Sequence, residues 1–325
     1  MSLSRPTAKI ATSGQTLTAA EAALLRARVS LSVLGTHDAI TLTVWRSSKL
    51  ADLATGDEVA IALGEVDDEV DVTKGTLAAR LVHGSTIELE VLAPTAALSQ
   101  HFVSKTYLRQ TVADIVNDLA GSVAVDQVDG DAQLAAYAVD DRRPAWSHLR
   151  DLADLVDADL GAADDGSLRF VAITGGSPVA IGAQSDVLAW GVGARTAAAP
   201  SAVAAYGASS EAGADQWHWI HRSPSPSGDG VLRLVGGFRA KEPADQLRTG
   251  LEARAARRAL GGRVVLVGHP DLRPGDVIQA SDAPGGDPGA LRILSIEHVL
   301  DPLRGFTSSL LVEGAGGGGG PGGLL

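Results

Sequence analysis

The sequence predicts a mixed β protein with an α+β middle, and three observations support this fold class. Residues 1–95 contain short runs that alternate apolar and polar side chains, as strands do. From about residue 104 the apolar spacing changes to the helical period. From residue 183 strand patterns return and continue to residue 313. The predicted order is strands, then a mixed region, then strands again.

The first region, residues 1–95, is predicted to hold five or six short strands. A Gly56-Asp57 turn precedes a run in which large apolar side chains alternate with alanine. Residues 76–93 predict a hairpin about Gly84-Ser85, with the apolar side chains of its second arm on one face. Short strands separated by turns predict a barrel or a sandwich.

The middle region, residues 96–182, begins with a predicted helix over residues 111–121. Its apolar side chains fall on one stripe, and Gly121 marks its end. Thr111 can accept a hydrogen bond from the first turn, and Asp114 stands three residues on, as in a capping box. These two residues therefore predict that the helix starts just after Thr111.

A second helix is predicted over residues 144–161. Pro144 suits a first helical turn, and Gly161 is expected just beyond the last turn. A turn at residues 164–166 then leads into a strand. Helices and strands thus alternate in the middle region.

The third region, residues 183–313, is predicted to be strand-rich, with a loop and a helix inserted at about 217–262. A Pro-Gly-Asp turn at 274–276 leads into an apolar strand, as Gly56-Asp57 does in the first region. The two Gly-Asp turns lie one in each strand-rich region, and we expect them to be equivalent turns. Residues 314–325 are mostly glycine and are expected to be flexible.

Composition narrows the function classes. The net charge of −12 disfavours nonspecific binding to nucleic-acid backbones. The absence of cysteine excludes disulfides and cysteine-ligated zinc. No run of about 18 apolar residues is present, and the N-terminus lacks the apolar core of a secretory signal. We expect synthesis in the bacterial cytoplasm and no direct binding to nucleic acid or membrane.

The sequence does not match the common catalytic and cofactor-binding motifs. Gly207 to Gly213 has the wrong spacing for a nucleophile elbow. Thr73 to Thr76 lacks the glycine frame of a phosphate loop, and "GVGART" at 191–196 lacks the third glycine of a dinucleotide fingerprint. We predict no catalytic, cofactor-binding or metal site, and no enzyme activity.

Four further sets of residues could carry chemistry, but each also has an ordinary structural interpretation. Two histidines three apart would lie on opposite faces of a strand and are too few for a closed metal site. Two tryptophans could anchor an interface but suit core packing better. Two carboxylates on one helical face could form an acid–base pair, although a solvated face is the simpler interpretation. Three aspartates loosely match a calcium loop but lack its final glutamate. These sets are His218 and His221, Trp217 and Trp219, Asp154 and Asp157, and Asp126, Asp129 and Asp131.

Four segments in a fixed order resemble the hub proteins of contractile phage tails, the phage late control protein D family. They also resemble the hub half of the VgrG spike proteins of type VI secretion and the hubs of extracellular contractile injection systems. The segments are "QTVADIVNDLAG", "WSHLRDLADLVDADLGAADDGSLRF", "GHPDLRPGDVIQ" and "LRILSIEHVLDPLRGFTSSL". The resemblance covers about residues 10–313.

The resemblance implies two similar small β-barrels with an α+β portion between them. Three copies would form a pseudo-six-fold ring that connects a six-fold tail tube to a three-fold spike. The implied partners are the tube protein, a separate spike protein and other baseplate proteins, within a phage tail or injection-system particle. The role so implied is structural, without a reaction.

Two other function classes stay open. A cell-wall hydrolase would use acids between Asp151 and Asp165, and the substitution Asp154→Asn would then abolish clearing of peptidoglycan. A monomeric carbohydrate or peptide adaptor would use Trp217 and Trp219.

Overall fold

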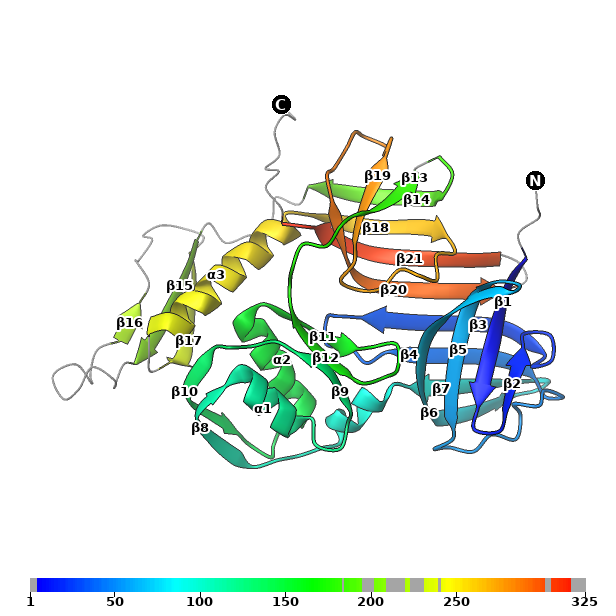
Figure 1. Ribbon diagram of the computed structural model, residues 1–325, viewed down its shortest axis with the longest axis horizontal. Coiled ribbons are helices and arrows are strands. Elements are labelled where there is room, and N and C mark those ends of the chain that lie inside the picture. The colour runs from blue at the N-terminus through cyan, green and yellow to red at the C-terminus, as the bar shows by residue number, and fades with distance from the viewer. Residues whose placement is uncertain are drawn as a thin grey trace.

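A 13-stranded, mostly antiparallel sheet forms the body of the molecule in the computed structural model (Figure 1). Its path runs β14-β18-β21-β20-β3-β4-β7-β6-β5-β1-β2, and β19 and β13 branch from β20. The chain is thus mostly β with a few helices, as predicted. The structure describes residues 5–182, 184–194, 202–208, 220–222, 231–238, 241–301 and 305–316.

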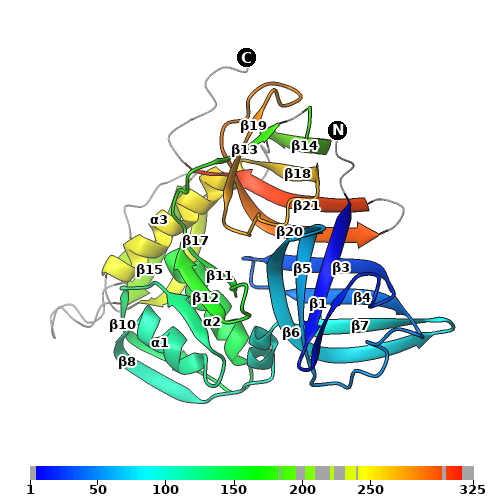
Figure 2. The same ribbon diagram turned by 45° about the vertical axis from the view of Figure 1, so that its right-hand side comes forward.

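The first half of the sheet curls around its own apolar core, as Figure 2 shows for β1 and β3–β7. Alternating side chains of these strands point inward, among them Ile40, Leu42 and Val44 on β4, each at most 1% exposed. The strands of this half are β1 (Pro6–Thr12), β2 (Gln15–Thr18), β3 (Leu24–Ser32), β4 (Ala39–Trp45), β5 (Glu58–Glu65), β6 (Asp68–His83) and β7 (Thr86–Leu92).

The second half of the sheet has a separate apolar core, to which Val264, Ile278 and Leu310 contribute. Its strands come from the C-terminal third of the chain and from two strands that follow the middle region. They are β13 (Val179–Gly182), β14 (Val187–Ala194), β18 (Leu260–Val267), β19 (Val277–Ser281), β20 (Leu291–Asp301) and β21 (Gly305–Gly314).

The two halves share one strand order. In the first half the order is β3-β4-β7-β6-β5, and in the second it is β14-β18-β21-β20-β19. Every pairing along both paths is antiparallel. Each of these five strands therefore has a counterpart in the other half.

The registers also correspond from strand to strand. In the first half Leu77 on β6 faces Val91 on β7, which faces Ile40 on β4, which faces Val29 on β3. In the second half the same positions run Ile293, Val312, Gly262 and Val192. Both β6 and β20 carry a bulge just after these residues, and both β3 and β14 carry one four residues before them. The bulges lie between Leu77 and Ala79, Ile293 and Ser295, Leu24 and Arg26, and Val187 and Ala189.

The Gly56-Asp57 turn is held by four hydrogen bonds. Gly56 adopts φ 99°, a conformation that favours glycine. Its amide donates to the carbonyl of Leu77 over 2.9 Å, and the Leu77 amide donates to the carbonyl of Asp57 over 2.8 Å. The Asp57 amide donates to the Ala54 carbonyl, and Asp57 Oδ2 accepts from the Ala54 amide. The turn thereby sets the register of β5 on β6.

The Gly275-Asp276 turn repeats all four bonds. Gly275 adopts φ 98°. Its amide donates to the Ile293 carbonyl over 2.8 Å, and the Ile293 amide donates to the Asp276 carbonyl over 2.8 Å. The Asp276 amide donates to the Arg273 carbonyl, and Asp276 Oδ2 accepts from the Arg273 amide. The two turns predicted to be equivalent are the same motif at matching places in the two halves.

The halves join through β20 and β3, which pair antiparallel from Ser295↔Ser32 to Leu300↔Ala27. Arg28 Nε donates to Glu297 Oε2 across this junction over 2.9 Å. The junction makes one continuous open sheet, so the described residues form no closed barrel, in contrast to the two small barrels expected. The physical reason is that β20 leaves β19 at its bulge and pairs with the other half instead of closing on its own.

The middle region packs two helices against two small sheets around its own core (Figure 1). The expected capping box of the first helix is confirmed, because Thr111 Oγ1 accepts from the Asp114 amide and Asp114 Oδ2 accepts from the Thr111 amide. The elements are η1 (Pro94–Ser99), β8 (Lys105–Thr111), α1 (Val112–Leu119), β9 (Val125–Val128), β10 (Gln133–Val139), α2 (Ala145–Val156), β11 (Ala158–Ala162) and β12 (Leu168–Ala172).

The second predicted helix ends earlier than expected. Residues 144–161 were predicted helical, but α2 ends at Val156 and residues 158–162 form β11. Asp157 adopts the left-handed conformation with φ 53°, which stops the helix, and ion pairs with Arg254 and Arg257 hold its carboxylate. Gly161 lies in the strand, where a Cβ atom would meet the Ser32 carbonyl oxygen at 2.6 Å.

A further small sheet and helix extend on the far side of the middle region (Figure 1). The sheet is β16-β15-β17, and α3 contacts it as well as α2 and β21. Of the loop expected at residues 221–230, residues 223–230 lie outside the described residues, and so do residues 317–325 of the expected tail 314–325. The elements are β15 (Ala202–Ala208), β16 (Ile220–Arg222), β17 (Val231–Phe238) and α3 (Lys241–Arg258).

The β20–β3 junction should weaken in acid because of His298. This ring is fully buried next to Ser308 Oγ, 2.8 Å from its Nδ1, and burial lowers the pKa of His298 from 6.5 to about 3. A lowered folded-state pKa contributes stability that is present above about pH 6.5 and is lost as the pH falls toward 3. We expect His298→Gln, which stays neutral, to flatten the fall of Tm between pH 6.5 and 4.

Thermal unfolding across that pH range tests this expectation. The exposed His83→Gln variant is the matched control and should keep the wild-type slope. Equal slopes for wild type and His298→Gln would show that His298 does not contribute to acid sensitivity.

Candidate functional site

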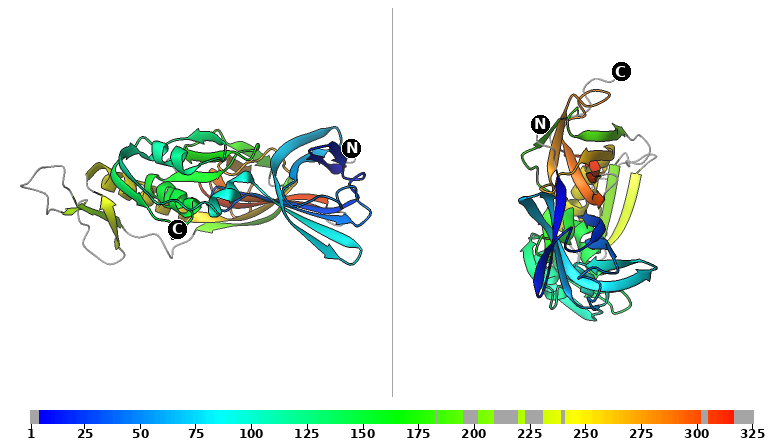
Figure 3. Two further views of the ribbon diagram at one scale, coloured as in Figure 1. Left: turned by 90° about the horizontal axis from the view of Figure 1, so that it is seen from below. Right: turned by 90° about the vertical axis from the view of Figure 1, so that its right-hand side faces the viewer.

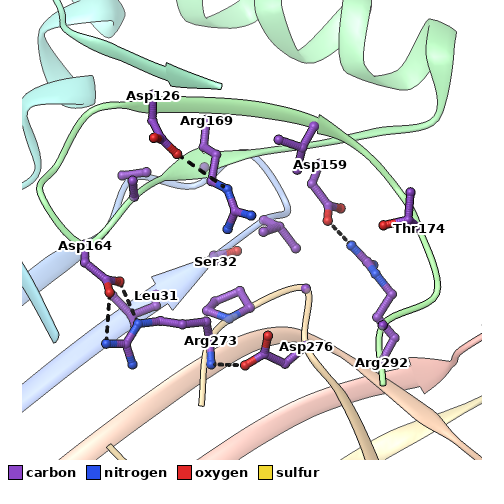
Figure 4. A pocket seen from close by; sticks show the side chains of 18 of the residues that line it. Leu31, Ser32, Asp126, Asp159, Asp164, Arg169, Thr174, Arg273, Asp276 and Arg292 are labelled. Carbon is purple, nitrogen blue, oxygen red and sulfur yellow. Dashed lines mark hydrogen bonds and ion pairs between the residues drawn. The ribbon is translucent and has the colours of Figure 1, made fainter. Parts of the chain in front are cut away.

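A cavity of about 720 Å³ lies where the two halves of the sheet meet the middle region. Its wall comes from β3, from β11 and β12, from the segment leading into β13, and from the Gly275-Asp276 turn (Figure 4). Acidic and arginine side chains face one another across it. This cavity is therefore the first candidate functional site.

Arg292 lines the cavity and links the middle region to the second half of the sheet. Its side chain is 3% exposed, and its guanidinium contacts the Asp159 carboxylate through Nη2 and Glu313 Oε1 over 3.2 Å through Nη1. Arg257 Nε also donates to Glu313, over 3.1 Å, and Arg257 Nη2 donates to Asp157 over 2.7 Å. Two arginines and three carboxylates thus form one buried network between β11, α3, β20 and β21.

Arg273 ties all three regions together on the opposite wall of the cavity. Its Nε donates to Asp164 of the middle region over 2.6 Å, and its Nη2 donates to the Asp71 carbonyl on β6 over 2.6 Å. Its own amide donates to Asp276 in the Gly-Asp turn. Five donors in a fixed fork allow a single arginine to hold this three-way contact.

Asp38 is the cavity residue with the most altered acidity. Burial raises the pKa of its carboxyl to about 7, although Oδ1 accepts a 2.9 Å hydrogen bond from the Ser32 amide, which acts in the opposite direction. The side chain is 4% exposed. Its hydrogen bond fixes the end of β3, where the chain turns toward the middle region.

The carboxylates that the sequence offered as an acid–base pair serve a different contact. Asp154 and Asp157 both bind Arg254 of α3, and Asp157 also binds Arg257. The nearby Asp151 pairs with Arg143 over 2.8 Å. The pairs with Arg254 and Arg257 hold α3 against the end of α2, and the carboxylates do not converge on a shared proton.

The three aspartates of the loose calcium-loop match are spread out. Asp129 accepts from Gln127 Nε2 and from the Ala172 amide, and Asp126 lies 3.9 Å from Arg169 Nε. Asp131 is exposed. Among the described residues, no group of three or more histidine, aspartate or glutamate side chains could hold a metal ion.

The remaining sequence candidates have structural positions or fall outside the described part of the chain. Residues 73–76 lie within β6, and residues 191–194 lie within β14. The backbone of His221 lies in β16. Trp217, His218 and Trp219 lie outside the described residues.

Sequence reasoning missed the buried charges. Arg292 and Glu313 stand next to core-facing apolar residues in "ALRIL" and "LLVEG", on the opposite face of their strands, where the middle region covers them. A charged residue that alternates with apolar residues in a strand ordinarily indicates a solvent-exposed face. The local pattern therefore gave no signal that these charges are buried.

Two strand edges that are unpaired in the described part of the chain, the far end of β6 and the outer side of β14, are the second candidate site. Residues 79–83 of β6 pair only with β7, and β14 pairs only with β18, as far as the described residues go. Exposed apolar side chains accompany both edges, with Leu81 42%, Val82 49% and Leu188 58% exposed. Open edges of this kind favour the addition of another strand.

Removing Arg292 should destabilise the fold more than removing an exposed arginine. Arg292→Met leaves the Asp159 carboxylate without its partner, and breaking a buried pair costs about 3 kcal/mol. The double variant Arg292→Met/Asp159→Leu should regain much of that loss, because no charge is then stranded. Arg143→Met, which breaks the exposed pair with Asp151, should cost below about 1 kcal/mol.

Urea unfolding of the three variants measures these differences. Equal losses for Arg292→Met and Arg143→Met would contradict a structural role for the buried network.

None of the helices described here is both long and apolar enough to cross a membrane. No family model matches the sequence, and no curated protein does.

Solved structures of phage tail proteins share the fold of the chain. A 43 kDa tail protein of prophage MuSo2 from Shewanella oneidensis superposes with a TM-score of 0.70 at 14% identity, over 96% of this chain and 99% of that one. A tail protein from Neisseria meningitidis MC58 gives 0.72 at 13% identity, over 95% and 96%.

An Escherichia coli protein described as a component of the type VI secretion system gives a TM-score of 0.61 at 12% identity, over 94% of this chain and 76% of that one. Its description adds a structural similarity to tail proteins of bacteriophage T4. The resemblance to tail and injection-system hubs is therefore confirmed at the level of the fold: the chain has the fold of phage tail proteins.

Proposed function

We propose that the protein is a structural hub that connects a six-fold tail tube to a three-fold spike. The particle would be a contractile phage tail or a phage-like contractile injection system. The fold shared with phage tail and type VI proteins supports a tail component. The hub role rests on a property of the chain itself, its internal repeat.

The repeated five-strand unit is the observation that carries the proposal. Each chain holds two units with one strand order, corresponding registers and the same Gly-Asp turn. Three chains in a closed ring would present six similar units on one surface and three copies of everything that is not repeated. Such a ring matches six-fold and three-fold partners at once, which a simple trimer of unrepeated chains does not.

The unrepeated middle region is where three-fold contacts would arise. It packs against the second half through the Arg292 and Arg257 network and against both halves through Arg273. A part that transmits force must keep its regions in fixed relative positions, and buried ion pairs between the regions oppose their separation. We infer a role without catalysis, since the acids that sequence reasoning offered as an acid–base pair are ion-paired in this network.

The partners in this proposal follow from the two symmetries. A tube protein would meet the six similar units, and a separate spike protein would meet the three-fold side. The strand β21 ends at Gly314 beside α3, and residues 314–325 would reach the spike from there. The protein would act as a component of the baseplate, together with other baseplate proteins.

The native mass of the purified protein tests the proposal. We expect a homotrimer near three times 33.2 kDa in multi-angle light scattering at concentrations up to 100 μM. A monomer at every concentration would contradict the hub. Clearing of peptidoglycan that is lost in Asp154→Asn would favour the hydrolase instead.

A further inference from the structure

We propose that the free edge of β6 in one copy pairs antiparallel with β14 of the next copy, with Val82 opposite Val192. The inference rests on the proposed ring and adds which strands close it and in which register. Its basis is the junction that the chain already makes between its own two halves.

The β20–β3 junction is the template. There the second half offers the outer edge of β20 after its bulge, and the first half offers the outer edge of β3. His298 on β20 faces Val29 on β3, with Glu297 opposite Ser30. This contact joins unit two to unit one within a chain, so the same contact from unit one to unit two needs a second chain.

The repeat gives the counterparts of both strands. The counterpart of β20 is β6, in which Leu77 matches Ile293, so Val82 matches His298. The counterpart of β3 is β14, in which Val192 matches Val29. Carrying the template over places Val82 of one copy opposite Val192 of the next, and Leu81 opposite Gly193.

The bulge on each strand marks where the partner changes. On β20, pairing with β19 ends at Leu291 and Arg292, and pairing with β3 begins at Ser295, just beyond the bulge. On β6, pairing with β5 ends at Thr76, and the bulge follows Leu77. Residues 79–83 follow the bulge of β6 as the part of β20 that pairs with β3 follows the bulge of β20. In the single chain, no described strand pairs with residues 79–83 on the side that corresponds to β3.

The chemistry of both edges favours a strand partner. Leu81 and Val82 are 42% and 49% exposed on β6, although Val72 and Leu77 earlier in the same strand are buried. Residues 187–194, "VLAWGVGA", contain no charged residue and no proline, the usual guards of an exposed edge. A second copy of this chain presents the complementary edge in each case.

The contact is head-to-tail, so its rotation decides between a ring and a filament. The edge of β6 that stays free ends at the β6–β7 hairpin, which projects away from the middle region (Figures 2 and 3). The projecting hairpin leaves room for a strand of another copy to lie along it.

Engineered cysteines test the register directly, because the natural chain has no cysteine. Facing residues of adjacent antiparallel strands have Cα atoms about 4.5–5.5 Å apart, within the range that a disulfide spans, whereas a one-residue offset places the side chains on opposite faces. We therefore compare two in-register pairs, Val82→Cys/Val192→Cys and Leu81→Cys/Gly193→Cys, with two offset pairs, Val82→Cys/Gly193→Cys and Leu81→Cys/Val192→Cys. A Cβ at Gly193 would meet nothing within 4 Å, so that substitution is mild.

The template contact supplies the matched control. Glu297→Cys/Ser30→Cys occupies the same relative position inside one chain and should form an intramolecular disulfide under the same mild oxidation. We expect the in-register pairs to give covalent dimers and trimers on non-reducing gels, with the ladder stopping at the trimer. The offset pairs should give at least tenfold less product.

The outcomes separate the inference from the proposed function. A trimer by mass with no preference for the in-register pairs would overturn the edge pairing and leave the hub standing. In-register ladders that continue beyond the trimer would support the strand pairing but contradict the closed ring. A monomer with no cross-links would overturn both.

Discussion

The pairing of β20 with β3 is the contact on which the rest of the structure depends. It joins residues almost 270 positions apart in sequence and turns two five-strand units into one open sheet. Because β20 pairs with β3, neither unit closes into a barrel among the described residues, and the far end of β6 and the outer side of β14 stay unpaired there. The same contact buries His298 and brings the Gly275-Asp276 turn beside the middle region, where Arg273 binds Asp164. The pairing of β20 with β3 therefore determines both the open sheet and its unpaired strand edges.

Charge in this protein is used for positioning. Acids that could have suggested catalysis bind arginines from other regions, as Asp157 binds Arg254 and Arg257 and Asp159 binds Arg292. Buried pairs of this kind add little net stability over apolar packing, but they penalise any arrangement that separates the partners. The proposed hub would benefit from such specificity, because its regions would have to keep fixed relative positions.

Local signals in the sequence predicted local structure well. Thr111 and Asp114 gave the start of α1, and the two Gly-Asp turns pointed to the internal repeat. What failed was non-local. Nothing near Val156 revealed that Asp157 would end α2, since arginines of α3 hold its carboxylate. The strand pattern left a barrel or a sandwich open, and the resemblance implied two small barrels. Strand periodicity shows which face is buried but not which strand lies next to it, and the β20–β3 pairing decided that.

The central claim is that the two halves are repeated units of one ring. Cryo-electron microscopy of the purified oligomer, reconstructed with three-fold symmetry only, tests it most directly. The account predicts a strong six-fold component in the sheet layer, with alternating units superposable after a rotation of about 60°, and only three-fold density for the middle region. A two-fold assembly, or a three-fold particle whose sheet layer lacks the six-fold component, would contradict it.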